Sequence, residues 1–232
     1  MRLAVLQSNY IPWKGYFDLI HDVDLFLFYD EVQYTKNDWR NRNKIKTENG
    51  LKWLTLPCGY DLNRRIYEVK IKSEIDWRNQ HYSILRQTYK KAPYYKKYDE
   101  FLHYIYLEKE WEYLYELNRY LIKHIAKEFL GITTKFDDSR NYQSNGKKEK
   151  KLFELVKSAG ADTYVSGLAA KAYLQPDDYQ KEGIEIVWKD YHGYPVYEQF
   201  FGKFCHEVSI LDLLFYVGDD APYYIWGWRE ND

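Results

Sequence analysis

An α/β fold with a mostly parallel, layered sheet is predicted by three observations in this 232-residue sequence. Short apolar runs typical of buried strands, such as RLAVLQ near the amino terminus, alternate with segments whose apolar residues recur at helical spacing. One helix-length segment joins the first two runs, which is typical of a parallel β–α–β unit. Asn49-Gly50 separates two alternating segments and favours a tight hairpin turn. We therefore expect a Rossmann-like arrangement with an added β-hairpin.

The first half of the chain contains the opening unit, the hairpin and a helical insert. The opening unit consists of the strand RLAVLQ, the helix PWKGYFDLIHDV and the strand DLFLFYDEVQY. We expect the hairpin at about residues 42–57 and expect the alternating segment 66–72 to extend its sheet. Three amphipathic, tyrosine-rich helices are expected in an insert at about residues 76–131, where Gly131 ends the last one. Their spacing is typical of a helical layer of the core.

The second half returns to alternating strands and helices. The strands expected there are ITTKF, DTYVSG and GIEIVWKD, and the helices are EKKLFELVKSAG, LAAKAYL and VSILDLLFYVG. We expect residues 1–232 to form a single α/β domain, because a chain of this length can build one large core.

Composition excludes several function classes. The formal net charge is −1, so we expect neither bulk nucleic-acid binding nor a membrane partner, although local basic patches remain compatible with it. Cys58 and Cys205 lie far apart, which argues against a disulfide framework. The six histidines form no metal-binding spacing, so no metal site is expected. No signal peptide or apolar span is recognisable, and we expect a cytoplasmic protein.

Polar residues follow three of the expected strands, where ligands bind in open parallel sheets. The first group is Gln7 to Tyr10, and the second is Asp30 and Glu31 followed by QYTKNDWRNRNK. Arginine forks and asparagine amides in that segment suit phosphate or carboxylate groups. Two structural alternatives remain open: the carboxylates could cap a turn, and the basic segment could be a solvated loop.

The third group is Ser166-Gly167, at the junction between a strand and an expected helix. The free N–H groups of a helix start favour an anion, so we expect phosphate binding there. An ordinary serine N-cap with a glycine for tight packing is the alternative. Lys147, in the loop before another helix, is a candidate mobile phosphate clamp.

The ordered segments QSNYIPWKGYFDLI, FYDEVQYTKNDWRNRNKI, LTLP, QTYKKAPYY, YVSGLAAKAYL and SILDLLFYVG resemble the WbqC-like proteins over essentially the whole chain. That family usually has Gln-Pro where this chain has Gln7-Ser8. A weaker, architectural resemblance links the chain to nucleotidylyltransferases and pantothenate synthetase. Those enzymes carry an HxGH motif in the first helix, and the equivalent Trp13-Lys14-Gly15-Tyr16 has neither histidine.

The resemblance implies a role in bacterial O-antigen or related surface-polysaccharide synthesis. The implied reaction adds an aminoacyl group such as glycyl, or an acyl group, to the amine of a nucleotide-linked amino sugar such as a dTDP-sugar. ATP or an aminoacyl donor such as aminoacyl-tRNA would supply the activated carboxyl group. The alternative is a non-catalytic nucleotide-sugar-binding or assembly protein of the same pathway.

On this basis, candidate site residues fall into three groups. The expected catalytic residues are Gln7, Asp30 and Glu31, with either carboxylate taking the ammonium proton. The expected phosphate-binding residues are Ser166, Gly167 and Lys147. The expected substrate-binding residues are Asn9, Tyr10, Trp13, Gly15, Tyr16, Gln33, Tyr34, Lys36, Trp39, Arg40, Asn41, Arg42 and Asn43.

Overall fold

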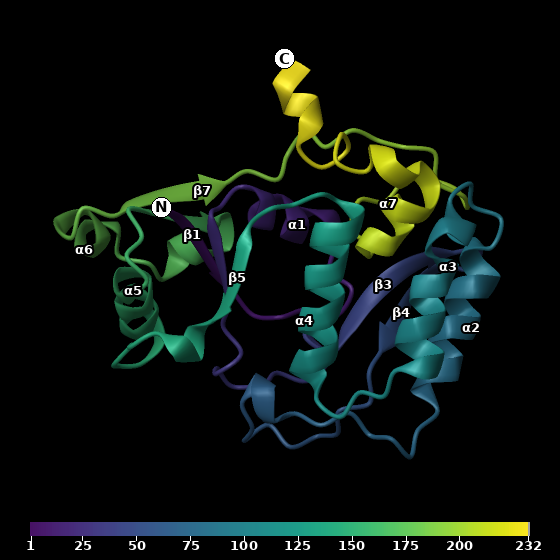
Figure 1. The fold of residues 1–232 in the computed structure, drawn as a ribbon, viewed down its shortest axis with the longest axis horizontal. Coiled ribbons are helices and arrows are strands. Elements are labelled where there is room, and N and C mark those ends of the chain that lie inside the picture. Colours follow the sequence, from purple (N-terminus) through teal and green to yellow (C-terminus); the bar gives the residue numbers. More distant parts are fainter. Residues whose placement is uncertain (232) are drawn as a thin grey trace.

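A five-stranded parallel sheet forms the centre of the molecule in a computed structural model, which describes residues 1–231 (Figure 1). The strands lie in the order β5-β2-β1-β6-β7. Their bounds are Arg2–Leu6 (β1), Leu25–Phe28 (β2), Lys135–Asp138 (β5), Thr163–Gly167 (β6) and Glu185–Lys189 (β7). The chain moves outward from β1 in one direction through β2 and β5, and in the other through β6 and β7. This doubly wound order confirms the predicted Rossmann-like α/β class.

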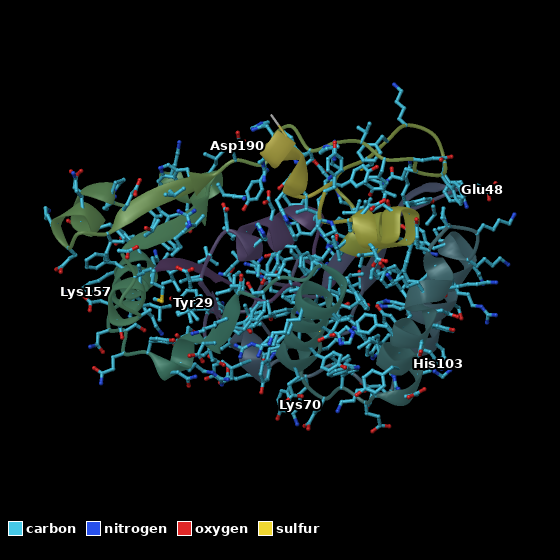
Figure 2. All side chains as sticks on the ribbon, turned by 45° about the horizontal axis from the view of Figure 1, so that its top comes forward. Tyr29, Glu48, Lys70, His103, Lys157 and Asp190 are labelled. Carbon is cyan, nitrogen blue, oxygen red and sulfur yellow. The ribbon has the colours of Figure 1, made fainter. Side chains whose placement is uncertain are left out.

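Helices cover both faces of this sheet because alternate strand residues point to opposite sides. Ala4 and Phe26 belong to the larger apolar cluster, whereas Leu3 and Leu27 belong to a smaller one on the other face. The larger cluster includes residues of α1 (Lys14–His21), α4 (Leu114–His124) and α7 (Ile210–Val217). The smaller includes residues of α5 (Lys148–Ser158) and α6 (Pro176–Lys181). Charged side chains such as Lys157, Lys70 and Asp190 lie at the periphery (Figure 2).

The hairpin and the helical insert pack against the larger cluster, on the side of the molecule away from α5 and α6 (Figure 1). The antiparallel strands β3 (Arg42–Thr47) and β4 (Gly50–Thr55) form the predicted hairpin, and Gly50 at its turn has a φ of +94°. The insert contains α2 (Trp77–Tyr89), α3 (Tyr95–His103) and α4. The last two continue as π-helical turns over Tyr104–Glu108 and Ile125–Phe129.

Two local predictions are wrong. Segment 66–72 does not extend the hairpin sheet; it contains a 3-10 turn at Ile66–Glu68 and one isolated bridge, because Ile66 and Val69 turn together into the core. The stretch after β6 is not an α-helix but a 3-10 helix, Leu168–Ala172, since α6 already begins at Pro176. The remaining 3-10 helices are Ser139–Asn141, Gly218–Asp220 and Gly227–Asn231. Within residues 1–231, no helix is both long and apolar enough to cross a bilayer.

Candidate functional site

A pocket of about 380 Å³ lies beside the loop that follows β1 and is the candidate site. Its lining residues are Asn9, Pro12, Trp13, Trp39, Asn43 and Glu207. A hollow of about 550 Å³ beside the hairpin turn, whose lining includes Trp53, is larger than this pocket. Two still larger surface hollows lie elsewhere. One, of about 990 Å³, is lined by residues at the amino ends of β1, β2 and β5, and the other, of about 980 Å³, lies between segments 70–79 and 106–116. Ligands of doubly wound sheets bind outside the carboxyl ends of strands, which favours the smaller pocket.

Two hydrogen bonds, one between backbone groups and one from a side chain, hold the loop 7–13 against the hairpin side of the pocket. The amide of Tyr10 donates to the carbonyl of Trp39 over 2.9 Å, and the side-chain amide of Asn43 donates to the carbonyl of Ile11 over 2.8 Å. Ile11 has a φ of +36°, a conformation that β-branched residues rarely adopt. The surrounding contacts therefore fix a strained backbone where the pocket begins, as is common at binding sites.

Two indoles form aromatic walls of the pocket. The Trp13 ring lies directly over Gly15, where an added Cβ would come within 2.3 Å of the indole. Gly15 thus makes room for Trp13, whereas its predicted role was the close approach of a ligand. Trp39 lies 5.6 Å, between ring centroids, from Trp53 of the hairpin. Flat aromatic faces of this kind suit sugar rings and nucleobases.

The polar groups of the pocket leave hydrogen-bonding capacity for a ligand. The side-chain oxygen of Asn9 is buried and has no hydrogen-bond partner. Leaving such an acceptor unpaired costs free energy, which a ligand donor would recover. Glu207 brings a carboxylate, and Lys44 Nζ lies 3.1 Å from it. By contrast, the Asn43 amide already donates to the carbonyls of Tyr10 and Ile11.

Lys14 lies one residue beyond the pocket wall and is almost completely buried. Its amine is 4.8 Å from the ring centre of Tyr194, and its one hydrogen bond described here reaches the carbonyl of Pro195 over 3.4 Å. Burial lowers the pKa of Lys14 to about 8, although Asp18 and Asp212 act in the opposite direction. Such an amine exchanges protons close to neutral pH.

The predicted catalytic carboxylates lie at the carboxyl end of β2 in a charged network. Asp30 is fully buried, accepts the amide of Ser8 over 2.8 Å and pairs with Arg119 Nε over 2.7 Å. Burial raises the pKa of Asp30, while Arg119 and Ser8 act against this rise. Arg119 also pairs with Asp138, which in turn accepts Arg140. Hydrogen bonds from Arg140 and Arg119 outweigh the effect of burial and hold the pKa of Asp138 below its usual range.

Glu31 also follows the carboxyl end of β2. Its carboxylate accepts a hydrogen bond from Ser139 over 2.9 Å and pairs with Lys151 of α5. Gln7 is half-buried, and its carbonyl accepts the hydroxyl of Tyr16 over 2.9 Å. Neither Gln7, Asp30 nor Glu31 is among the residues that line the pocket. Their catalytic role stays a prediction.

The structure brings four predicted substrate residues together: Asn9, Trp13, Trp39 and Asn43 line the pocket. The tyrosines Tyr10 and Tyr34 are instead almost completely buried, and Asn41 donates to the carbonyl of Leu56 inside the fold. Other predicted residues lie outside the pocket lining and engage protein partners. Tyr16 packs against Phe26, Gln33 donates to Leu62, Lys36 lies over Tyr60, Arg40 pairs with Asp38, and Arg42 lies over Trp53.

The predicted phosphate residues lie at two places. Ser166 and Gly167 end β6, where an added Cβ at Gly167 would come no closer than 3.7 Å to Tyr191. The φ of Gly167 is −70°, a backbone conformation that any residue can adopt. The expected helix start is a 3-10 turn, which weakens the argument for an anion there. Lys147 is exposed at the N-cap of α5, and its role stays a prediction.

Pro12 and Glu207 line the pocket although the sequence pattern did not single them out. Arg119 and Lys14 were likewise not predicted as site residues. No local signal places Glu207 in the pocket or Arg119 beside Asp30, because both contacts exist only in the tertiary fold. The amide of Ile210, three residues after Glu207, donates to the carbonyl of Pro12 over 2.9 Å and brings that distant segment to the first loop.

Comparison with known proteins identifies a matching family and a similar protein. The model of the WbqC-like protein family matches residues 7–224. An uncharacterized protein of Mycobacterium tuberculosis is 43% identical over 226 residues, which cover 97% of each chain. No solved structure matches the chain at a significant level. Within residues 1–231, no cluster of three or more histidine, cysteine or carboxylate side chains could hold a metal ion.

Proposed function

The chain belongs to the WbqC-like protein family, and from this premise we propose that it transfers an aminoacyl group such as glycyl, or an acyl group, to the amine of a nucleotide-linked amino sugar. The observation that carries the proposal is the pocket, which combines two indole walls with an unpartnered amide oxygen and a carboxylate. Each of these features matches one part of an amino sugar.

The match can be followed group by group. The indoles of Trp13 and Trp39 offer apolar faces to the C–H surface of a sugar ring. The free acceptor on Asn9 would take a hydrogen bond from a hydroxyl or ammonium group. Glu207, the carboxylate of the pocket lining, is paired with Lys44 and would exchange this partner for a protonated sugar amine.

Amide formation needs the amine in its neutral form next to an activated carbonyl carbon. Glu207 would accept the ammonium proton or position the amine. The pocket would hold the amine and the activated carbonyl carbon close together in the orientation for attack. Asp30 is already paired with Arg119, and Glu31 with Lys151. In this proposal the two carboxylates stabilise the charged network at the carboxyl end of β2.

A direct assay tests this function. Purified protein is incubated with a dTDP-amino sugar and glycine, with either ATP or glycyl-tRNA, and the amide product is detected by mass spectrometry. Glu207→Gln and Trp39→Ala should reduce product formation, whereas Glu198→Gln, an exposed carboxylate of the same segment, should not. Absence of product with both donors across several amino sugars would refute the transferase.

One observation favours a second function, a non-catalytic nucleotide-sugar-binding or assembly protein. Both carboxylates predicted to be catalytic are engaged in ion pairs, and Glu207, the carboxylate of the pocket lining, is itself paired with Lys44. Calorimetry separates the two functions: sugar binding that depends on Trp39, without turnover under any donor condition, would establish the binding protein.

A further inference from the structure

The hairpin presents one face of cations and aromatic rings to solvent beside the pocket. Because residues paired across a hairpin point to the same side, Lys44 and its partner Trp53 share the outer face with Arg42. The alternate residues Ile45 and Leu54 are buried on the inner face. The outer face is therefore a separate surface at Arg42, Lys44 and Trp53. It ends at Lys46, which is buried and donates to Gln199 and to the carbonyls of Gly202 and Lys203.

Cations and aromatic rings on this face are interleaved. The guanidinium carbon of Arg42 lies 4.1 Å from the ring centre of Trp53. Lys44 Nζ lies 5.7 Å from the ring centres of both Trp39 and Trp53; its side chain is 14% exposed and pairs with the exposed carboxylate of Glu207. A third pair continues the pattern outside the hairpin, where Lys36 Nζ is 3.5 Å from the ring centre of Tyr60.

The rings remain accessible despite these contacts. Trp39 is 42% exposed, Trp53 is 40% exposed and Tyr60 is 78% exposed. Leaving two neighbouring indoles in water forfeits hydrophobic free energy, which makes a surface of this kind a marker of an interaction site. The cations beside the rings favour a partner that carries both flat apolar groups and negative charge.

We propose that this outer face binds single-stranded RNA, and that the strand is the unpaired 3′ end of an aminoacyl-tRNA whose acyl group enters the pocket. This inference rests on the proposed transferase function and names its acyl donor. Bases stack on exposed aromatic rings, and lysine and arginine neutralise the phosphates between them. A lone nucleotide sugar needs one base platform, whereas this face offers two adjoining indoles.

Continuity with the pocket supports this donor. Trp39 belongs to both surfaces: it lines the pocket and its ring centroid is 5.6 Å from that of Trp53. A strand stacked on Trp53 would therefore place its end at the pocket mouth. Glu48, at the hairpin turn, lies at the periphery of the molecule (Figure 2), and a hollow of about 550 Å³ whose lining includes Trp53, Leu51 and Glu48 lies beside it.

The transfer step balances without a further reactant. The neutral sugar amine attacks the ester carbonyl of the aminoacyl-tRNA, the amide C–N bond forms, and the ester C–O bond breaks. The proton lost by the amine goes to the ribose oxygen, which leaves as the free 3′-terminal hydroxyl of the tRNA. No ATP is consumed in this step.

Fluorescence anisotropy with a labelled single-stranded RNA ending in CCA tests the surface directly. We expect binding at low salt that weakens as salt is raised, because cations of the face release counterions from the phosphates. Trp53→Ala should weaken binding about tenfold, the effect of losing one stacked base. Arg42→Gln should weaken it and reduce the salt dependence.

Two matched variants serve as controls. Tyr223→Ala removes a 47%-exposed ring, and Lys96→Gln removes an exposed charge on α3; both should bind the strand as the parent does. The proposal is overturned if the strand does not bind at low salt, or if Trp53→Ala behaves like the controls. A dimer that Trp53→Ala dissociates, seen by size-exclusion chromatography, would also overturn it and make this face a subunit interface.

The outcomes separate this inference from the proposed function. Amide product formed from free glycine and ATP without RNA would overturn the tRNA donor and leave the transferase intact. RNA binding that depends on Trp53, with no product from any donor, would overturn the transferase and retain the RNA surface.

Discussion

Replacing the buried Lys14 by methionine should change how the stability of the protein depends on pH. The amine lies 4.8 Å from the ring centre of Tyr194 and 5.6 Å from that of Tyr197, and burial lowers its pKa from 10.5 to about 8. Asp18 and Asp212 oppose this change, and His206 is a further titratable neighbour. Methionine has a similar length and apolar character but no titrating group.

The sign and size follow from proton linkage. Between pH 8 and 10.5 the unfolded chain holds the Lys14 proton while the folded protein has released it, so the native state gains stability as pH rises. The full difference corresponds to about 3 kcal/mol, because one pKa unit is worth about 1.4 kcal/mol. Between about pH 6.5 and 9.5, the wild-type protein should gain about 2 kcal/mol relative to Lys14→Met.

Urea unfolding followed by circular dichroism at the two pH values measures this difference. Subtracting the free energy of unfolding of Lys14→Met from that of the wild type cancels the titration of groups that both proteins share. Lys96→Met, on the exposed face of α3, controls for the loss of one surface lysine. If the difference stays constant within experimental error across this range, the amine is not desolvated in solution and the argument about Lys14 is wrong.

Three further predictions address packing, charge and the pocket. Leu121→Ala should cost about 2–5 kcal/mol of stability by urea unfolding, since Leu121 is almost completely buried; a loss below 1 kcal/mol would contradict its place in the core. Asp30→Asn should cost about 1–3 kcal/mol in the same assay, because Arg119 loses its buried partner but keeps Asp138, and an unchanged midpoint would show the pair to be dispensable. Gly15→Ala should displace Trp13 and weaken nucleotide-sugar binding by calorimetry about tenfold, an effect of about 1.4 kcal/mol; unchanged affinity would exclude the Trp13 wall from the site.

Local patterns in the sequence were sufficient to predict most of the helices, strands and turns. The hairpin follows from Asn49-Gly50, since Gly50 adopts the positive φ that the turn requires. Gly131 and Gly160 follow their helices with positive φ, as the helix-end signals predicted. Local patterns failed at 66–72 and at 168–172, where burial against distant elements and the nearby Pro176 decided the backbone.

Part of the candidate site was also recognisable, because one short stretch of chain carries several of its residues. Asn9 and Trp13 follow the first strand directly, and the position of a strand end within a parallel sheet can be predicted. Trp39 and Asn43 come from the basic segment that the sequence marked as unusual. Tyr34 and Asn41 from that same segment are buried, and no pattern in a loop tells which of its side chains point inward.

The sequence by itself determined most of the elements, the parallel pairing of the first two strands, and the loops from which the pocket is built, because periodicity and turn chemistry act between near neighbours. Only the tertiary structure decided that Glu207 and Asn9 line the same pocket, that Arg119 forms an ion pair with Asp30, and that the Lys14 amine is buried. Contacts between distant segments depend on the packing of whole layers, and the desolvation that changes the chemistry of a side chain exists only once those layers have closed around it.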